Sequence, residues 1–234
     1  MSANNKITII SGASGGLGQT VSRVFHQAGA SVVLVASRPD GVQALADEFG
    51  ADRALAIGAN LADPAGTEAV VATTLERFGR VDILLNLAGG FAGGAPVSES
   101  SEDDLNKMLD INLRTCYNLS RAAVKPMITQ KWGRIVNIGS KDSLHGRANY
   151  SAYAISKAAV LRLTESMAEE VKQYNITVNA LIPSAIDTEA NRKAMPNADF
   201  SKWVQPATIA ETLLFLVQEK TAINGAAIPL NEQM

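Results

Sequence analysis

The stretch YSAYAISK at residues 150–157 places two phenols close to one ammonium. Tyr153 and Lys157 are four positions apart, so on a helix their side chains lie on one face. A phenol with a pKa of about 10 exchanges protons poorly near neutral pH unless its ionised form is stabilised. Lowering that pKa by about three units takes ~4 kcal/mol, which one ammonium at ~4 Å supplies at an effective dielectric constant of ~20. Tyr153 is therefore a candidate general acid and base, with Lys157 as its activator.

Three further polar side chains bear on this hypothesis. Tyr150 is expected in the loop that leads into the helix, where it lines a pocket or packs. For Tyr153 the ordinary alternative is a half-buried tyrosine beside a lysine, which is found on many helices without chemistry. Ser140 follows the apolar run GRIVNIG, where its hydroxyl can bind a substrate oxygen that gains charge. Loop serines more often turn the backbone, and Ser143 is a nearby competitor. Asn112 lies inside a predicted helix, where asparagine usually points to solvent.

The glycine-rich turn SGASGGLG at residues 11–18 indicates a second kind of chemistry. Glycines let the backbone approach a pyrophosphate, whose negative charge is stabilised by the free N–H groups at the start of the next helix. Ser11 and Ser14 are expected to donate hydrogen bonds to phosphate oxygens. A tight connection without a ligand is the plainer alternative, but the strand before the turn and the helix after it favour a dinucleotide.

The end of the second apolar run favours one nicotinamide cofactor over the other. NAD is usually held by a carboxylate about twenty residues after the glycines, whereas an arginine suits the 2′-phosphate of NADP. Here Ser37 and Arg38 stand at this position, and Arg38 offers a planar fork for phosphate. A solvated surface arginine is the alternative, and Asp40 lies close by. The sequence predicts NADP(H) in preference to NAD(H).

These residues must be positioned by alternating strands and helices. Apolar runs of strand length occur at 6–11, 31–36, 53–58, 81–86, 133–139, 176–182 and 226–230. Segments with helical period occur at 17–28, 41–49, 65–78, 102–124, 151–173 and 207–218, and Pro126 is expected to end the fourth of them. Strands without polar alternation are typical of a parallel sheet covered on both faces. The predicted fold is α/β: one Rossmann-like, doubly wound parallel sheet of about seven strands, in a single domain spanning 1–234.

Composition narrows the class of partner. The chain has 234 residues, of which 47% are hydrophobic, and 21 basic residues nearly balance 23 acidic ones. A nearly neutral chain is not attracted to nucleic acid or to anionic membranes, so the expected binding partner is a small-molecule substrate. No apolar run approaches the length of a membrane span, and no signal peptide is evident. The chain has one cysteine, Cys116, so no internal disulfide is expected. Its two histidines, His26 and His145, are far apart, so no metal site is expected. We expect a cytoplasmic location.

Taken together, these motifs resemble the short-chain dehydrogenase/reductase family over essentially the whole chain. The resemblance rests on SGASGGLG, LNLAGG at 85–90, Asn112 in LDINL, the serine thirteen residues before the tyrosine of YAISK, and IPSAIDT at 182–188. It implies a catalytic tetrad in which Tyr153 is the acid and base and Ser140 orients a carbonyl. Lys157 would lower the phenol pKa and hold the nicotinamide ribose, and Asn112 would maintain a water-linked proton path.

The resemblance also implies cofactor contacts beyond the glycine turn. The expected set is Gly12, Ser14, Gly15, Gly16, Leu17 and Gly18 at the phosphates, Asn60 and Leu61 at the adenine, Asn86, Ala88 and Gly89 along the ribose, and Ile182, Pro183, Ile186 and Thr188 around the carboxamide. Three positions depart from the family pattern. Asn60 replaces an aspartate, Leu87 replaces an asparagine, and Ser184 replaces a glycine. Each is expected to alter cofactor affinity without removing a catalytic group.

The segment 186–205, here called the lid segment, is expected to cover the substrate. It resembles the corresponding part of quinonoid dihydropteridine reductase, but that enzyme usually lacks the serine and prefers NADH, so a carbonyl reductase is the first hypothesis. A 3-oxoacyl carrier-protein reductase is another, which would need basic residues to bind an acidic partner; the candidates are Lys131, Arg134, Arg147 and Lys172. A dinucleotide-binding sensor without turnover is the alternative of another class. Candidate substrate residues are Phe91, Ser140, Leu144, His145, Tyr150, Ile186, Met195 and Trp203.

Family members usually assemble, so a homodimer or homotetramer is expected. The resemblance places the contact on helices 102–124 and 151–173. Their apolar surface would come from Leu105, Met108, Leu109, Leu119, Leu161, Leu163 and Met167. The same residues could instead face the sheet, as apolar stripes on helices usually do.

Overall fold

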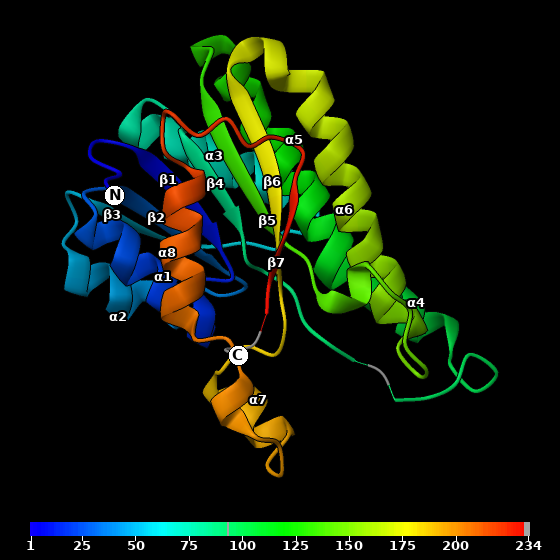
Figure 1. Ribbon diagram of the computed structural model, residues 1–234. Helices are drawn as coiled ribbons and strands as arrows, with labels where there is room; N and C mark the ends of the chain where they lie inside the picture. The colour runs from blue at the N-terminus through cyan, green and yellow to red at the C-terminus, as the bar shows by residue number, and fades with distance from the viewer. Residues whose placement is uncertain (93, 232–234) are drawn as a thin grey trace.

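Within residues 1–92 and 94–231, which this computed structural model describes, seven parallel strands form one sheet (Figure 1). Their order across the sheet is β3-β2-β1-β4-β5-β6-β7. The strands are β1 Ile7–Ser11, β2 Ser31–Ala36, β3 Ala54–Gly58, β4 Ile83–Asn86, β5 Gly133–Ile138, β6 Ile176–Pro183 and β7 Ala227–Leu230. The central strands are buried apolar runs, so helices must cover both faces of the sheet. The predicted doubly wound parallel sheet is confirmed.

The helices lie in two layers, one on each face of the sheet (Figure 1). One layer consists of α1 Gly16–Gln27, α2 Asp40–Phe49 and α8 Pro206–Leu216. The other contains α3 Pro64–Phe78, α5 Thr115–Gln130 and α6 Ser151–Val171. Shorter helical segments are α4 Glu102–Met108, η1 Leu109–Arg114, η2 Lys141–Ser143, η3 Lys172–Tyr174, α7 Glu189–Ala194 and η4 Phe200–Lys202. Each layer packs an apolar core against the sheet, which fixes the strand ends that carry the candidate site.

Local sequence explains where several helices begin and end. Asp63 caps α3 by accepting a hydrogen bond from the backbone N–H of Ala65, and a proline follows at the first helical position. Gly79 ends the same helix in the left-handed conformation that glycine adopts readily. Ser101 and Asp104 form a reciprocal capping box at the start of α4.

The prediction that Pro126 would end its helix is wrong. The helix α5 continues through Pro126 to Gln130, and the chain turns at Lys131 in a left-handed conformation with φ of 55°. A proline inside a helix removes one backbone hydrogen bond. The next side chain, Met127, is fully buried in the core, and burial of a side chain of this size contributes about 2 kcal/mol. That packing offsets the lost hydrogen bond and keeps the last turn helical.

The predicted helix 102–124 is also not one regular helix. It consists of α4, a π-helical segment η1 at Leu109–Arg114, and α5. Such wide turns are rare and occur frequently at functional sites. The segment η1 lies against α6, and it places Asn112 inside the molecule.

The strand order reverses between β1 and β4, which are neighbours in the sheet although far apart in the sequence. In open α/β sheets, ligands bind outside the carboxyl ends of the strands at such a point. The glycine turn follows β1, and residues 87–91 follow β4 at the same edge. Helix α7 of the lid segment extends beyond this edge of the sheet (Figure 1). Among the described residues, no helix combines the length and the apolar character needed to cross a membrane.

Candidate active site

Ser140 and Tyr153 meet at the carboxyl edge of the sheet. Ser140 follows β5, Tyr153 lies in the first turn of α6, and their side chains are hydrogen-bonded. Burial raises the pKa of Tyr153, and the hydrogen bond with Ser140 opposes this shift. The sequence led us to expect a lowered pKa. In the structure the pKa of Tyr153 is raised instead, because removing the phenol from water disfavours its charged form.

Lys157 lies one turn further along α6 and is almost completely buried, with 5% of its surface exposed. Its Nζ donates a hydrogen bond of 2.9 Å to the backbone oxygen of Ile138, the last residue of β5. Burial lowers the pKa of this lysine to about 8, and the nearby thiol of Cys116 opposes the shift. The ammonium of Lys157 therefore points to the end of β5, two residues before Ser140.

Asn112 is buried and bridges two parts of the site. Its Oδ1 accepts a hydrogen bond of 3.0 Å from the backbone N–H of Gly90, and its Nδ2 donates to the oxygen of Gly90 and to Ser156. The expectation that a mid-helix asparagine points to solvent is therefore wrong. The π-helical segment turns Asn112 inward, where the backbone after β4 satisfies its amide.

Gly89 shows how closely these groups converge. A Cβ atom on Gly89 would lie 2.7 Å from Asn112 Oδ1 and 3.2 Å from Lys157 Nζ. Real Cβ atoms essentially never approach other atoms as closely as the first of these distances. Only glycine therefore fits at this position while Asn112 and Lys157 keep their places.

Aromatic rings line the approach to Tyr153. The ring of Phe91 stacks on Tyr150 with centroids 4.8 Å apart, and it meets Tyr153 edge-on at 5.1 Å. Phe91 remains 52% exposed, so one of its faces is available to a ligand. The structure thus brings two predicted substrate residues, Phe91 and Tyr150, to the predicted acid and base.

The glycine turn has the form of a phosphate-binding site. Gly12 has a positive φ of 68°, and a Cβ there would lie 2.8 Å from the backbone nitrogen of Ala88. A Cβ on Gly18 would lie 2.2 Å from the oxygen of Gly12, so the turn and the helix need glycine to approach each other. Helix α1 begins without a side-chain cap and without an acidic residue in its first turn. Its first N–H groups, from Gly16 to Gly18, are therefore available to a phosphate.

The two serines of this turn differ in role. Ser11 is buried, and its Oγ accepts hydrogen bonds of 3.1 Å from the backbone N–H groups of both Leu87 and Ala88. Its hydroxyl donates to the backbone oxygen of Leu85, so the expectation that Ser11 donates to a phosphate is wrong. Ser14 is exposed beside the start of α1 and remains a candidate phosphate contact.

Side chains expected at the adenosine part differ in their exposure. Ser37 and Arg38 are exposed at the end of β2, and Arg38 has no ion pair within the described chain. Asn60 is exposed, and its Oδ1 accepts a hydrogen bond from the N–H of Ala62. Leu61 is buried against the core. Ser37, Arg38 and Asn60 are therefore accessible at the ends of β2 and β3, whereas Leu61 is not.

Asn86 lies deeper than the expected ribose contact. It is 4% exposed, and its Nδ2 donates to Ser120 and Asn137 in the interior. Its Oδ1 is buried without a hydrogen-bond partner. The residues Ala88 and Gly89, which follow, are more accessible and remain the better candidates for contact with the nucleotide.

The start of the lid segment approaches the glycine turn. A Cβ on Gly16 would lie 3.3 Å from the side chain of Thr188, so Thr188 and the phosphate turn are neighbours. Pro183 is buried at the end of β6, and Ile186 is half-buried and pairs with Val204 across the lid segment. The segment that follows β6 therefore adjoins the same crevice as the turns after β1 and β4.

Two predicted substrate residues are placed less favourably. Trp203 is only 6% exposed and meets the ring of Phe200 edge-on within the lid segment, so it serves as an anchor. His145 is exposed in the loop after η2. Of the predicted substrate residues, the structure brings together Ser140, Phe91 and Tyr150 at Tyr153.

Three of the basic residues considered for an acidic protein partner lie at the wrong edge of the sheet. Lys131 and Arg134 stand where β5 begins, and Lys172 precedes β6, all at the amino edge of the strands. Arg134 is moreover 1% exposed and donates to the backbone oxygens of two distant segments. Only Arg147 lies near Tyr153, and it is paired with Asp142. Sequence analysis overlooked Asp142, although a carboxylate two residues after Ser140 is a readable signal.

Comparison with known proteins gives a consistent result. The family model for short chain dehydrogenase matches residues 6–199. The 3-oxoacyl-(acyl-carrier-protein) reductase FabG of Escherichia coli (strain K12) is 31% identical over all of this chain and 99% of its own. Oxidoreductase UcpA of Salmonella typhimurium is 39% identical over 78% of this chain and 70% of its own.

A solved structure with the same architecture is a gluconate 5-dehydrogenase from Burkholderia cenocepacia J2315, in complex with NADP and tartrate. It superimposes with a TM-score of 0.91 at 28% identity, over 98% of this chain and 95% of that one. The sheet order, the glycine turn and the family match over most of the chain agree. By this agreement the chain is a member of the short-chain dehydrogenase family, and as such an NAD(P)-dependent oxidoreductase.

Proposed function

We propose that this enzyme interconverts a small carbonyl compound and its alcohol, with Tyr153 as the general acid and base and NADP(H) as the preferred cofactor. The single observation that carries the proposal is the hydrogen-bonded pair of Ser140 and Tyr153, at the same edge of the sheet as the glycine turn. Bound there, the nicotinamide would supply or accept the hydride. The chain has to place the substrate oxygen and move one proton.

The proposed steps follow from the contacts. In reduction, Tyr153 gives its hydroxyl proton to the carbonyl oxygen as this oxygen gains negative charge, and Ser140 donates a hydrogen bond to the same oxygen. In oxidation, the phenolate of Tyr153 takes the hydroxyl proton of the alcohol. Lys157 holds a positive charge at the end of β5, and Asn112 keeps the backbone at Gly90 in register with α6. A water-linked path from Asn112 to Lys157 stays a prediction.

An assay of cofactor oxidation tests this proposal directly. We expect the protein to oxidise NADPH in the presence of some members of a panel of aldehydes and ketones. Tyr153→Phe should lower turnover about 10²-fold or more while cofactor affinity is retained. Tyr174→Phe is the matched control, because Tyr174 lies in η3 at the opposite edge of the sheet. Tight NADPH binding without turnover on the whole panel would instead favour the sensor.

The preference for NADP(H) rests on Arg38. Its guanidinium is exposed at the end of β2, no carboxylate follows it directly, and the described residues offer it no ion-pair partner. The gluconate 5-dehydrogenase relative was solved with NADP, which supports the same choice. Arg38→Asp should weaken NADPH binding far more than NADH binding, as measured by calorimetry. An equal loss for the two cofactors would refute the role of Arg38.

A 3-oxoacyl carrier-protein reductase is the second candidate, and the relatives favour it. The Escherichia coli enzyme of that name aligns over the whole chain at 31% identity. Against this candidate, Arg147 is the one basic residue of the four named that stands near Tyr153, and Asp142 already pairs with it. A comparison of kcat/KM for an acyl-carrier-protein substrate and for the free ketone distinguishes the two candidates. The resemblance of the lid segment to quinonoid dihydropteridine reductase stays a prediction, as does the cytoplasmic location.

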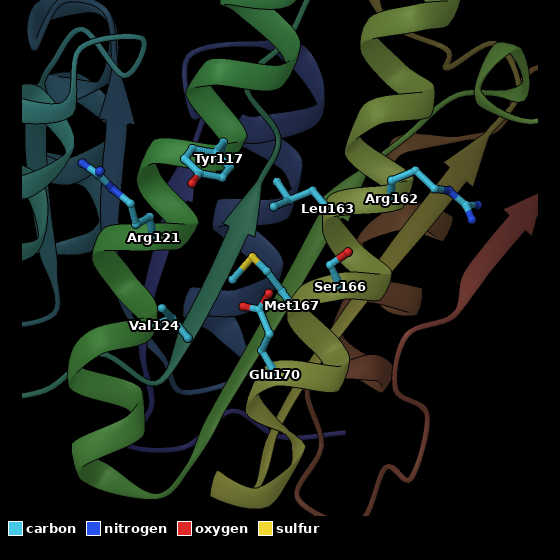
Figure 2. A pocket seen from close by; sticks show the side chains of 8 residues that line it. All are labelled: Tyr117, Arg121, Val124, Arg162, Leu163, Ser166, Met167 and Glu170. Carbon is cyan, nitrogen blue, oxygen red and sulfur yellow. The ribbon is translucent and has the colours of Figure 1, made fainter.

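We also propose that the protein assembles through α5 and α6. A groove of about 400 Å³ runs between these helices, and Figure 2 shows the side chains that line it. Several residues predicted for this interface are buried in the protein's own core, among them Met108, Leu119 and Leu161. Leu163 and Met167 do line the groove, together with the exposed ring of Tyr117. An apolar groove on paired helices is a suitable surface for a second copy of the chain.

A further inference from the structure

The loop between β5 and α6 carries an ion pair for which the proposed reaction gives no role. Arg147 and Asp142 face each other through two contacts, Nε to Oδ1 at 3.1 Å and Nη2 to Oδ2 at 3.3 Å. The side chain of Asp142 is only 13% exposed, whereas that of Arg147 is 57% exposed. The pair is bidentate and partly removed from water, so it is better fixed than an ordinary surface ion pair.

One end of this ion pair holds the hydroxyl of Ser140. The Oγ of Ser140 accepts a hydrogen bond of 3.2 Å from the backbone N–H of Asp142, and it lies 3.4 Å from the carboxylate Oδ2 of the same residue. The backbone N–H of Ser140 donates to Ser143 Oγ at 2.9 Å. The position of the Ser140 hydroxyl is therefore set by the loop that Asp142 and Arg147 hold together.

The other end of the ion pair rests on the aromatic side chains of the site. The guanidinium carbon of Arg147 lies 3.6 Å from the centroid of the Tyr150 ring. Tyr150 stacks on Phe91, and Phe91 meets the ring of Tyr153. With the hydrogen bond between Tyr153 and Ser140, these contacts form a closed ring around the approach to the phenol.

We propose that Asp142 is a positioning residue for Ser140, and that Arg147 cancels the charge of Asp142 at Tyr153, so that the pair sets the pH range in which Tyr153 exchanges its proton. This inference rests on the proposed function, because it concerns the same serine and tyrosine. A lone carboxylate could orient the serine hydroxyl equally well, but it would also oppose ionisation of the neighbouring phenol. The guanidinium removes that conflict.

The electrostatics agree in sign with this arrangement. Burial is the main cause of the raised pKa of Tyr153, and the hydrogen bond with Ser140 lowers that pKa. The charge of Asp142 raises the pKa of Tyr153, and the charge of Arg147 lowers it. The other titratable or charged groups nearby in the chain are Lys141, His145, Tyr150, Lys157 and, on α5, Cys116. The segments η1 and α4, which pack against α6, add Asp110, Arg114, Glu102, Asp103, Asp104 and Lys107. Strand β6, against which η2 packs, contributes no titratable side chain.

The test compares the pH profile of kcat/KM for carbonyl reduction among charge variants. Reduction needs the protonated phenol, so its rate falls as pH rises through the pKa of Tyr153. Arg147→Gln should move this fall to higher pH and Asp142→Asn to lower pH, each by on the order of half a unit. The double variant should return close to the wild-type profile, and Arg147→Lys should restore most of it. Asp142→Ala should lower kcat more than it changes KM, because Ser140 is no longer held.

A second readout separates this inference from the proposed function. The phenolate absorbance of each variant, minus that of the same variant carrying Tyr153→Phe, reports the titration of Tyr153 without turnover. If no carbonyl is reduced, the proposed function fails while this titration still measures the influence of the pair. The matched controls are Arg23→Gln and Glu48→Gln, each of which breaks the distant Arg23–Glu48 pair. Shifts no larger than those of the controls, or equal in sign for Asp142→Asn and Arg147→Gln, would overturn the inference.

Discussion

At the scale of single residues, the buried ammonium of Lys157 makes stability depend on pH. Burial lowers its pKa to about 8 in the folded protein, from the ordinary value of 10.5. Between these two values the unfolded chain binds more protons than the folded one. The free energy of unfolding should therefore rise with pH across this window, by on the order of 3 kcal/mol from this residue.

Chemical unfolding of the wild type and of Lys157→Met between about pH 7 and about pH 11 checks this prediction. The difference in unfolding free energy, wild type minus variant, should increase with pH, because the variant lacks the group that must lose its proton on burial. Lys125→Met, at an exposed site on α5, should show no such trend. If the difference in unfolding free energy does not change with pH in this range, the pKa of Lys157 is not lowered by burial.

Gly89 gives a prediction about geometry. In Gly89→Ala, the new methyl group would lie 2.7 Å from Asn112 Oδ1 and 3.2 Å from Lys157 Nζ. Asn112 is held by three hydrogen bonds to Gly90 and Ser156, so it cannot move aside freely. We expect turnover to fall about tenfold or more and unfolding free energy to fall by about 1–2 kcal/mol.

The matched control for this substitution is Gly146→Ala. A Cβ on Gly146 would meet no heavy atom within 4 Å, and Gly146 lies in the loop just before α6. Steady-state kinetics and thermal unfolding of the two variants should therefore differ clearly. Similar losses in both would show that the close approach of Gly89 to Asn112 has no consequence for the site.

Sequence reasoning at this scale succeeded where spacing alone defines proximity. The four-residue spacing puts Tyr153 and Lys157 on one helix, and the strand end predicts Ser140 beside them. It failed where the role of a side chain depends on a hydrogen-bond partner far away in the sequence. Ser11 was expected at a phosphate, but its hydroxyl is bound by the backbone after β4. The inward direction of Asn112 likewise depends on a π-helical turn that no residue type specifies.

At the scale of elements, strands were predicted to within about a residue or two because buried parallel strands are uninterrupted apolar runs. The starts of α3 and α4 were predicted from the helical period alone, and the structure adds the capping residues Asp63 and Ser101 at these positions. The interruption of helix 102–124 by η1 and the continuation of α5 past Pro126 were not predictable in this way. Both depend on packing against neighbouring helices and the sheet, which outweighs local propensity.

Asp187 connects the start of the lid segment to its middle and to its end. Its carboxylate accepts hydrogen bonds from Arg192 and from Gln205, and its backbone N–H donates to the oxygen of Val204. These hydrogen bonds lower the pKa of Asp187 to about 2. Because the folded pKa is below the ordinary 3.8, this stabilisation is present above about pH 4 and is lost as pH falls toward about 2.

Asp187→Asn should therefore loosen the lid segment at neutral pH. We expect faster amide hydrogen exchange across residues 186–205, with unchanged protection in strands β1, β4 and β5. Glu189→Gln is the matched control, since the exposed Glu189–Lys193 pair lies on the same segment. If the two variants exchange equally, Asp187 does not fasten the lid segment.

At the scale of the whole molecule, the parallel sheet collects segments that are far apart in the sequence. The turns after β1, β4, β5 and β6 all lie at one edge of the sheet, and helix α7 extends beyond that edge (Figure 1). The order of elements was enough to predict which loops share that edge. It did not indicate which helix surfaces stay uncovered, because an apolar residue on a helix can face either the sheet or a neighbouring molecule.

The groove between α5 and α6 yields the last prediction, which concerns assembly. Tyr117 is 48% exposed on α5, and Leu163 and Met167 line the groove from α6 (Figure 2). If a second copy binds here, Leu163→Glu would replace an apolar contact with a charged side chain that must lose its water in the interface, which is unfavourable. Sedimentation velocity should show the wild type as a dimer or tetramer and Leu163→Glu as a smaller species, with the fold intact by circular dichroism. Val97→Glu, at an exposed apolar residue in the loop before α4, should sediment as the wild type does. A wild type that sediments as a monomer would end the proposal, and a Leu163→Glu variant that remains fully assembled would place the interface on another surface.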